Sequence, residues 1–127
     1  MSTPSSIFDV SDRVIMVTGG SSGLGLQAVK TFVQCGARVA SVARMHDVGI
    51  NEAVLALATG QNKPRFIHAD ITNPAEVTRS FDECEAAFGT VTVLFNNAGI
   101  SQKQRAREIA RASWSDLMAV NVDAQFF

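Results

Sequence analysis

Tyrosine is absent from this chain of 127 residues, and cysteine is scarce. The two cysteines, Cys35 and Cys84, form no CxxC pair, which favours reduced thiols in a cytoplasmic protein over a secreted disulfide scaffold. The polar residues 1–6 lack the basic segment and the apolar segment that together make a secretory leader. No apolar run is long enough to span a bilayer, so no membrane association is expected.

Excess charge of either sign is also missing. The chain has 11 Lys and Arg residues against 12 Asp and Glu residues, a formal net charge of -1. This balance argues against a dedicated binder of nucleic acid or of anionic membranes. The composition is 46% hydrophobic and 18% charged, as in ordinary globular proteins, and the length suits one domain. His46 and His68 lack partners at metal-ligand spacing, so no metal site is expected.

Short apolar runs alternate with helical patterns along the chain, which indicates βαβ units. The runs lie at residues 14–17, 38–42, 65–69 and 91–95. Continuous apolar runs of this kind are typical of strands that are buried on both faces of a parallel sheet. The sequence therefore predicts an α/β fold with a doubly wound parallel sheet.

Helices are expected between and after these runs, over residues 24–35, 51–59, 74–88 and from 113 onward. The third is the best marked, because Asn73 can cap it and Pro74 suits its first position. The residues Ser113-Trp114-Ser115-Asp116 resemble a capping box with Asp in place of Glu, which predicts that Ser113 caps the last helix.

A glycine-rich turn, Thr18-Gly19-Gly20-Ser21-Ser22-Gly23-Leu24-Gly25, stands between the first strand and the first helix. Glycines there permit a tight turn and let backbone N–H groups approach a pyrophosphate at the positive end of the helix. The alternative is a glycine-rich turn without a ligand. The strand before it and the helix after it favour binding.

A second motif, Asn96-Asn97-Ala98-Gly99, directly follows the fourth strand. Small residues at the carboxyl end of a parallel strand let a ligand pass close to the sheet edge. The alternative is an ordinary turn rich in Asn and Gly.

The sequence resembles the classical short-chain dehydrogenase/reductase family at four places. These are the two motifs above, Asp70 in His68-Ala69-Asp70-Ile71-Thr72, and Asn121 in Val120-Asn121-Val122. The resemblance implies a Rossmann-type sheet in strand order 3-2-1-4, truncated after about four strands. Residues 1–127 would then be a single incomplete NAD(P)-binding domain, the N-terminal part of a longer alcohol/carbonyl oxidoreductase. The parent protein would be a homodimer or homotetramer that acts on a small-molecule substrate.

The resemblance also assigns roles to individual residues. Asp70 would hydrogen-bond the adenine, and the alternative is a turn residue before a helix, since Thr72 and Asn73 follow. Asn121 would organise a proton-relay water in the active site, and the alternative is a structural amide tied to neighbouring backbone. The expected cofactor-binding residues are Thr18, Gly19, Ser21, Ser22, Gly23, Leu24, Gly25, Arg44, Asp70, Ile71, Asn97, Ala98 and Gly99. Thr92 stands where the family usually has an aspartate that supports the sheet, which puts local stability in question.

The choice between NADP and NAD depends on the end of the second strand. An NAD enzyme places a carboxylate about 20 residues beyond the glycine motif, on the ribose hydroxyls. Here the residues are Val42-Ala43-Arg44, and an arginine can pair with a 2′-phosphate. The sequence therefore predicts NADP as the preferred cofactor, with NAD as the alternative. Ser22 weakens this prediction, because NADP enzymes of the family often carry a basic residue there.

The family's proton donor is a tyrosine, supported by a lysine four residues later and a serine on the preceding strand, and all three would lie beyond Phe127. Because the chain has no tyrosine, we expect it to be inactive by itself. Two other interpretations stay open, a non-catalytic dinucleotide-binding module and a decayed remnant.

Overall fold

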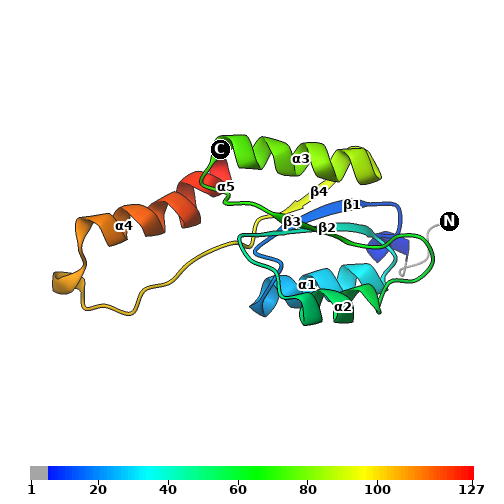
Figure 1. Cartoon of the computed structure of the whole chain (residues 1–127), viewed down its shortest axis with the longest axis horizontal. Coiled ribbons are helices and arrows are strands. Elements are labelled where there is room, and N and C mark those ends of the chain that lie inside the picture. Colours follow the sequence, from blue (N-terminus) through cyan, green and yellow to red (C-terminus); the bar gives the residue numbers. More distant parts are fainter. Residues whose placement is uncertain (1–5) are drawn as a thin grey trace.

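The computed structural model describes residues 6–127, so most of the polar segment 1–6 lies outside the described residues. Four parallel strands form one sheet in the order β3-β2-β1-β4 (Figure 1). Their bounds are β1 (Val14–Thr18), β2 (Arg38–Ala43), β3 (Arg65–His68) and β4 (Val93–Phe95). The predicted α/β class and the strand order are confirmed.

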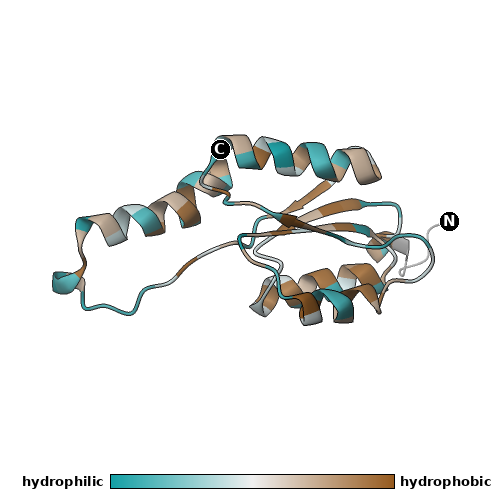
Figure 2. Ribbon diagram, viewed as in Figure 1, coloured by the Kyte–Doolittle hydropathy of each residue, from teal (hydrophilic) through white to brown (hydrophobic). Residues whose placement is uncertain are grey.

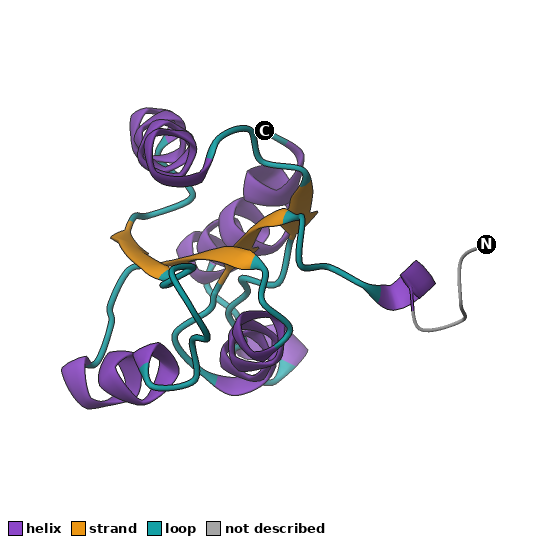
Figure 3. Cartoon of the chain, turned by 90° about the vertical axis from the view of Figure 1, so that its right-hand side faces the viewer, coloured by secondary structure: helices purple, strands orange, loops and turns teal. Residues whose placement is uncertain are grey.

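Helices cover both faces of this sheet, as Figure 3 shows. α1 (Gly23–Gln34) and α2 (Val48–Leu55) lie on one face, and α3 (Pro74–Phe88) lies on the other. After β4 the chain runs out to α4 (Arg111–Met118), which extends away from the sheet (Figure 1). A π-helical turn, Ala119–Asp123, and the short α5 (Ala124–Phe126) then lead back toward the start of α3.

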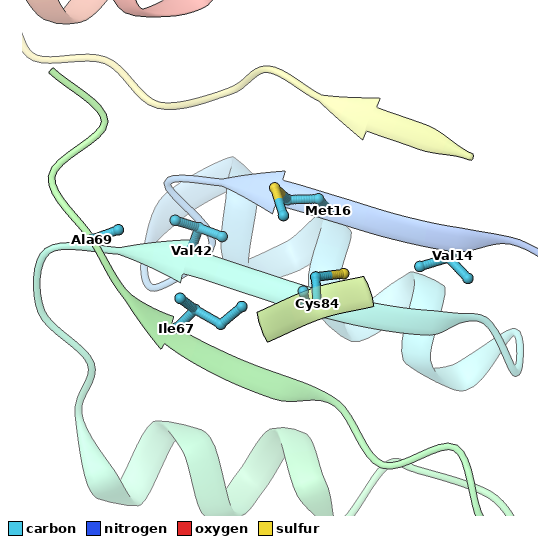
Figure 4. Packing of buried hydrophobic residues seen from close by; sticks show 7 residues of the cluster. Val14, Met16, Val42, Ile67, Ala69 and Cys84 are labelled. Carbon is cyan, nitrogen blue, oxygen red and sulfur yellow. The ribbon is translucent and has the colours of Figure 1, made fainter. Parts of the chain in front are cut away.

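Strand residues alternate between two apolar clusters, one on each face of the sheet. The cluster under α3 contains Val14, Met16, Ala40, Val42, Ile67, Ala69 and Cys84, most of which Figure 4 labels. The cluster under α1 and α2 contains Ile15, Val17, Val29, Val33, Ala37, Val39 and Val54. All of β1 is buried, and much of the sheet is brown in Figure 2. Both cysteines are free, and burial raises the pKa of the Cys84 thiol.

Two helix starts differ from the prediction. α2 begins at Val48 because Asp47 accepts a hydrogen bond from the Ile50 amide at 3.0 Å and so acts as its cap. The prediction that Ser113 caps the last helix is wrong. α4 begins at Arg111, the extended Ala110 occupies its cap position, and no side chain caps it.

Candidate functional site

A groove with a volume of about 490 Å³ lies where the carboxyl ends of the four strands meet. Open parallel sheets bind their ligands at this place, because the loops that follow neighbouring strands diverge there. The predicted residues that line the groove are Gly19, Ser21, Ser22, Arg44, Asp70, Ile71, Ala98 and Gly99. The structure therefore brings both sequence motifs, the end of β2 and the end of β3 to one surface.

The glycine-rich turn is tight enough to require glycine. Gly19 has a φ of +69°, and a Cβ there would lie 2.8 Å from the Cα of Ala98. A Cβ on Gly25 would overlap the carbonyl oxygen of Gly19. Gly23 has a φ of +55° and faces open space, so only its backbone conformation requires glycine. Leu24 lies at the start of α1 and is exposed, with a relative accessibility of 83% for the residue.

The start of α1 offers a site for an anion. Ser22 occupies the cap position, yet its side chain makes no capping hydrogen bond. The first amides of the helix therefore keep their partial positive charge available beside the groove that Ser22 lines. A glycine-lined turn before such a helix end fits a diphosphate without steric conflict.

Thr18 and Asn97 connect the glycine-rich turn to the motif at residues 96–99 through hydrogen bonds. The Thr18 hydroxyl accepts hydrogen bonds from the amides of Asn97 and Ala98, both at 3.1 Å. In return the Asn97 side chain donates from Nδ2 to the carbonyl oxygens of Thr18 at 3.2 Å and Gly19 at 3.3 Å. These two side chains thus join the turn after β1 to the segment after β4, and their neighbours Gly19 and Ala98 line the groove.

Asp70 faces the groove but is already engaged on its own loop. Its Oδ1 accepts a hydrogen bond from the Thr72 hydroxyl at 2.7 Å and another from the Thr72 amide at 2.9 Å. These bonds lower the pKa of Asp70, and the charge of Arg44 lowers it further. Asp70 is therefore an ionised turn residue before α3, and it also lines the groove beside Arg44.

The Asn121 side chain is tied to neighbouring backbone. Its Oδ1 accepts from the Ile100 amide at 2.8 Å, and its Nδ2 donates to the Ile100 carbonyl at 2.8 Å. Asn121 lies in the π-helical turn, a feature that occurs frequently at functional sites. The amide is thus satisfied by backbone, which was the alternative that the sequence left open.

Several contributors to the site were missed at the level of sequence. Met45, Ile100 and Val120 also line the groove, and an apolar side chain gives no chemical signal of such a position. Gln125 donates a hydrogen bond to the carbonyl oxygen of Ala98 at 2.8 Å. The sequence did contain a signal for Gln125, because an amide among the apolar residues of the last helix needs hydrogen-bond partners when it is half-buried.

Within residues 6–127, no group of three or more histidine, cysteine or acidic side chains is arranged to hold a metal ion. None of the helices in that range has both the length and the apolar character needed to cross a membrane.

The sequence itself matches known proteins over nearly its whole length. Residues 13–127 match the family described as short chain dehydrogenase. The chain is 41% identical over 130 residues to the probable galactose dehydrogenase GalD of Rhizobium meliloti, covering 100% of this chain and 50% of that protein. It is 38% identical to the NADP-dependent (R)-specific alcohol dehydrogenase of Lentilactobacillus kefiri, covering 91% of this chain and 45% of the relative.

Solved structures agree in fold. A short-chain type dehydrogenase/reductase from Mycobacterium marinum superposes with a TM-score of 0.90 at 24% identity, over 98% of this chain and 50% of that one. A short-chain dehydrogenase/reductase from Serratia marcescens superposes with a TM-score of 0.82 at 30% identity, over 93% of this chain and 48% of that one. The chain spans about half the length of the curated relatives it matches. With the glycine turn, the groove and the strand order already in place, these matches show that the chain belongs to the short-chain dehydrogenase family.

Proposed function

We propose that this chain is the N-terminal cofactor-binding part of an NAD(P)(H)-dependent alcohol/carbonyl oxidoreductase, with NADP(H) as the preferred dinucleotide. The observation that carries the proposal is the close-packed glycine turn at the start of α1, which opens into the groove. The bound dinucleotide would supply or accept a hydride, and the protein would supply its position.

Each part of the groove has a role in this proposal. The amides from Thr18 to Gly25 would hold the diphosphate, and Asp70 with Ile71 would contact the adenine. Arg44 is exposed at the end of β2 and would pair with the 2′-phosphate. Asn97, Ala98 and Gly99 would form the wall along the nicotinamide half.

Asn121 would act through Ile100. Both polar atoms of the Asn121 side chain hydrogen-bond the Ile100 backbone, so Asn121 would hold the segment that follows Gly99. We propose that this fixed segment helps to place the proton-relay water. The substrate would be a small alcohol or carbonyl compound, and the parent protein would be a cytoplasmic homodimer or homotetramer.

By itself the chain would show no turnover, because it contains no tyrosine to donate the proton. The alternative functions, a non-catalytic dinucleotide-binding module and a decayed remnant, differ in their response to cofactor. A module would be stabilised by the dinucleotide, whereas a remnant would not.

The test is calorimetric titration of the purified chain with NADPH and with NADH, together with thermal unfolding. We expect NADPH to bind more tightly and to stabilise the fold by about 2.7 kcal/mol when it is present at about 100 times its Kd. Gly25→Ala, which would crowd the turn, should abolish this stabilisation. Failure of both dinucleotides to bind would contradict the proposal, and measurable carbonyl reduction would contradict the expected inactivity.

A further inference from the structure

We infer that Gln125 is a positioning residue for the far wall of the groove. Its Nε2 donates a hydrogen bond to the carbonyl oxygen of Ala98 at 2.8 Å and a longer one to that of Val120 at 3.3 Å. The Ala98 bond joins α5 to a loop that lies 27 positions earlier in the chain. Ala98 lines the groove and Gln125 does not, so Gln125 contacts the wall without lining the site.

The orientation of the Gln125 amide follows from its partners. Both neighbours of the amide are carbonyl oxygens, so only the NH₂ group can face them. The Oε1 atom then points into buried space, where no donor among residues 6–127 reaches it. The side chain therefore holds backbone only through its NH₂ group, which contacts the carbonyl oxygens of Ala98 and Val120.

Gln125 and Asn121 hydrogen-bond the two residues that flank Gly99. Gln125 holds the carbonyl of Ala98, and Asn121 holds the amide and the carbonyl of Ile100. Gly99 lies between these anchors and lines the groove, where a Cβ would come within 3.3 Å of the Asn121 Oδ1. The last helical segment thus fixes the 98–100 wall at two points, one on each side of Gly99.

This inference rests on the proposed function, and it predicts an effect on only one half of the cofactor. The 98–100 wall would lie along the nicotinamide half, whereas Arg44 and Asp70 would serve the adenosine half. Loss of the Gln125 donor should therefore weaken binding of the whole dinucleotide and spare a fragment that carries only the adenosine half. A general loss of structure would weaken both ligands together.

The experiment compares Kd values for NADPH and for adenosine 2′,5′-bisphosphate in two variants of the chain. Gln125→Glu places a carboxylate without a hydrogen against two carbonyl oxygens at pH 8, and Gln125→Met removes the amide while keeping the length. We expect the Kd for NADPH to rise about tenfold in both, as for one or two lost hydrogen bonds. The Kd for the bisphosphate should stay within about twofold of wild type.

Gln104→Glu is the matched control, because Gln104 is exposed on the loop before α4. It should leave both Kd values unchanged. In NMR spectra without ligand, the amide signals of Gly99 and Ile100 should shift more in the Gln125 variants than those of Ser21 and Ser22.

The outcomes separate the two proposals. If wild type binds neither ligand, the proposed function fails, and the amide shifts still test the contact of Gln125 with the wall. If wild type binds both ligands and the ratio of the two Kd values is unchanged in both variants, the role of Gln125 is overturned. Equal weakening of both ligands would also overturn it.

Discussion

Around the groove, polar side chains divide into those that line it and those that hydrogen-bond the backbone of its walls. Arg44 and Asp70 line the groove, whereas the side chains of Thr18, Asn97 and Asn121 hydrogen-bond backbone atoms. Both kinds are needed, because a binding site keeps its geometry only if the residues behind it are themselves held. A substitution in the second group should therefore change the affinity for the proposed dinucleotide by altering the backbone that lines the groove.

Arg44 offers the sharpest test of cofactor preference. If Arg44 pairs with the 2′-phosphate as proposed, Arg44→Ala should raise the Kd for NADPH roughly 10- to 100-fold, because it would remove charge-assisted hydrogen bonds of about 1.5–3 kcal/mol. The Kd for NADH should stay nearly the same, since NADH carries no 2′-phosphate. Calorimetric titration of both cofactors measures the difference.

A matched control is Arg107→Ala, which removes an exposed arginine in the 3₁₀ turn before α4. It should leave both affinities unchanged at fixed ionic strength. Equal losses for NADPH and NADH in Arg44→Ala would show that Arg44 does not read the 2′-phosphate.

At the level of elements, the short edge strand β4 depends on a side chain at its start. The Thr92 hydroxyl accepts a hydrogen bond from the amide of Val14 at 3.0 Å, and the Thr92 amide donates to the Val14 carbonyl at 2.9 Å. Thr92 thus joins the start of β4 to β1, at a position where the family usually has an aspartate. Threonine supplies the necessary acceptor without a charge.

We expect Thr92→Val, which keeps the shape and removes the hydroxyl, to lower the free energy of unfolding by about 1 kcal/mol. The cause is the buried Val14 amide, which would lose an acceptor. Urea unfolding followed by circular dichroism measures the change.

Thr90→Val is the control at an exposed threonine two positions earlier. It should change stability by less than about 0.5 kcal/mol. If the two variants lose stability equally, the hydroxyl of Thr92 is not what joins β4 to β1.

For the molecule as a whole, we expect the half-buried His46 to make stability depend on pH. His46 follows β2, and its Nε2 lies 3.1 Å from the carbonyl oxygen of Ile67 on β3. The rings of Phe66 and His68 pack against it with centroids 5.6 Å and 5.0 Å away. Burial lowers the pKa of His46 below its ordinary 6.5, and the nearby His68 adds to this effect.

Because the folded state has the lower pKa, the stability from neutral His46 is complete above pH 6.5 and is lost as the pH falls below it. The unfolded chain then binds a proton that the folded chain does not. We expect the free energy of unfolding to decline between pH 7.5 and about pH 5.5, and His46→Gln to flatten that decline. Urea unfolding across this range measures both slopes, and an unchanged slope in the variant would exclude His46 as the cause.

Much of the fold could be predicted from local signals. The β-branched runs gave the strands, and Asn73 with Pro74 gave the start of α3, because a cap and a proline act within one helical turn. The same reasoning failed at Ser113, where the sequence fits a capping box but the chain is already helical from Arg111. A capping motif signals a helix start only if the preceding backbone is extended there.

The sequence by itself determined the alternation of strands and helices and the position of the glycine turn, because these depend on periodicity and on backbone freedom at single positions. Its motifs resembled those of one family, and that resemblance implied the strand order. Only the tertiary structure decided which polar residues face the groove and which hold its walls. Thr18 with Asn97, and Gln125 with Ala98, are pairs far apart in the chain. Their hydrogen bonds arise from the packing of whole elements, and no pattern within one segment encodes them.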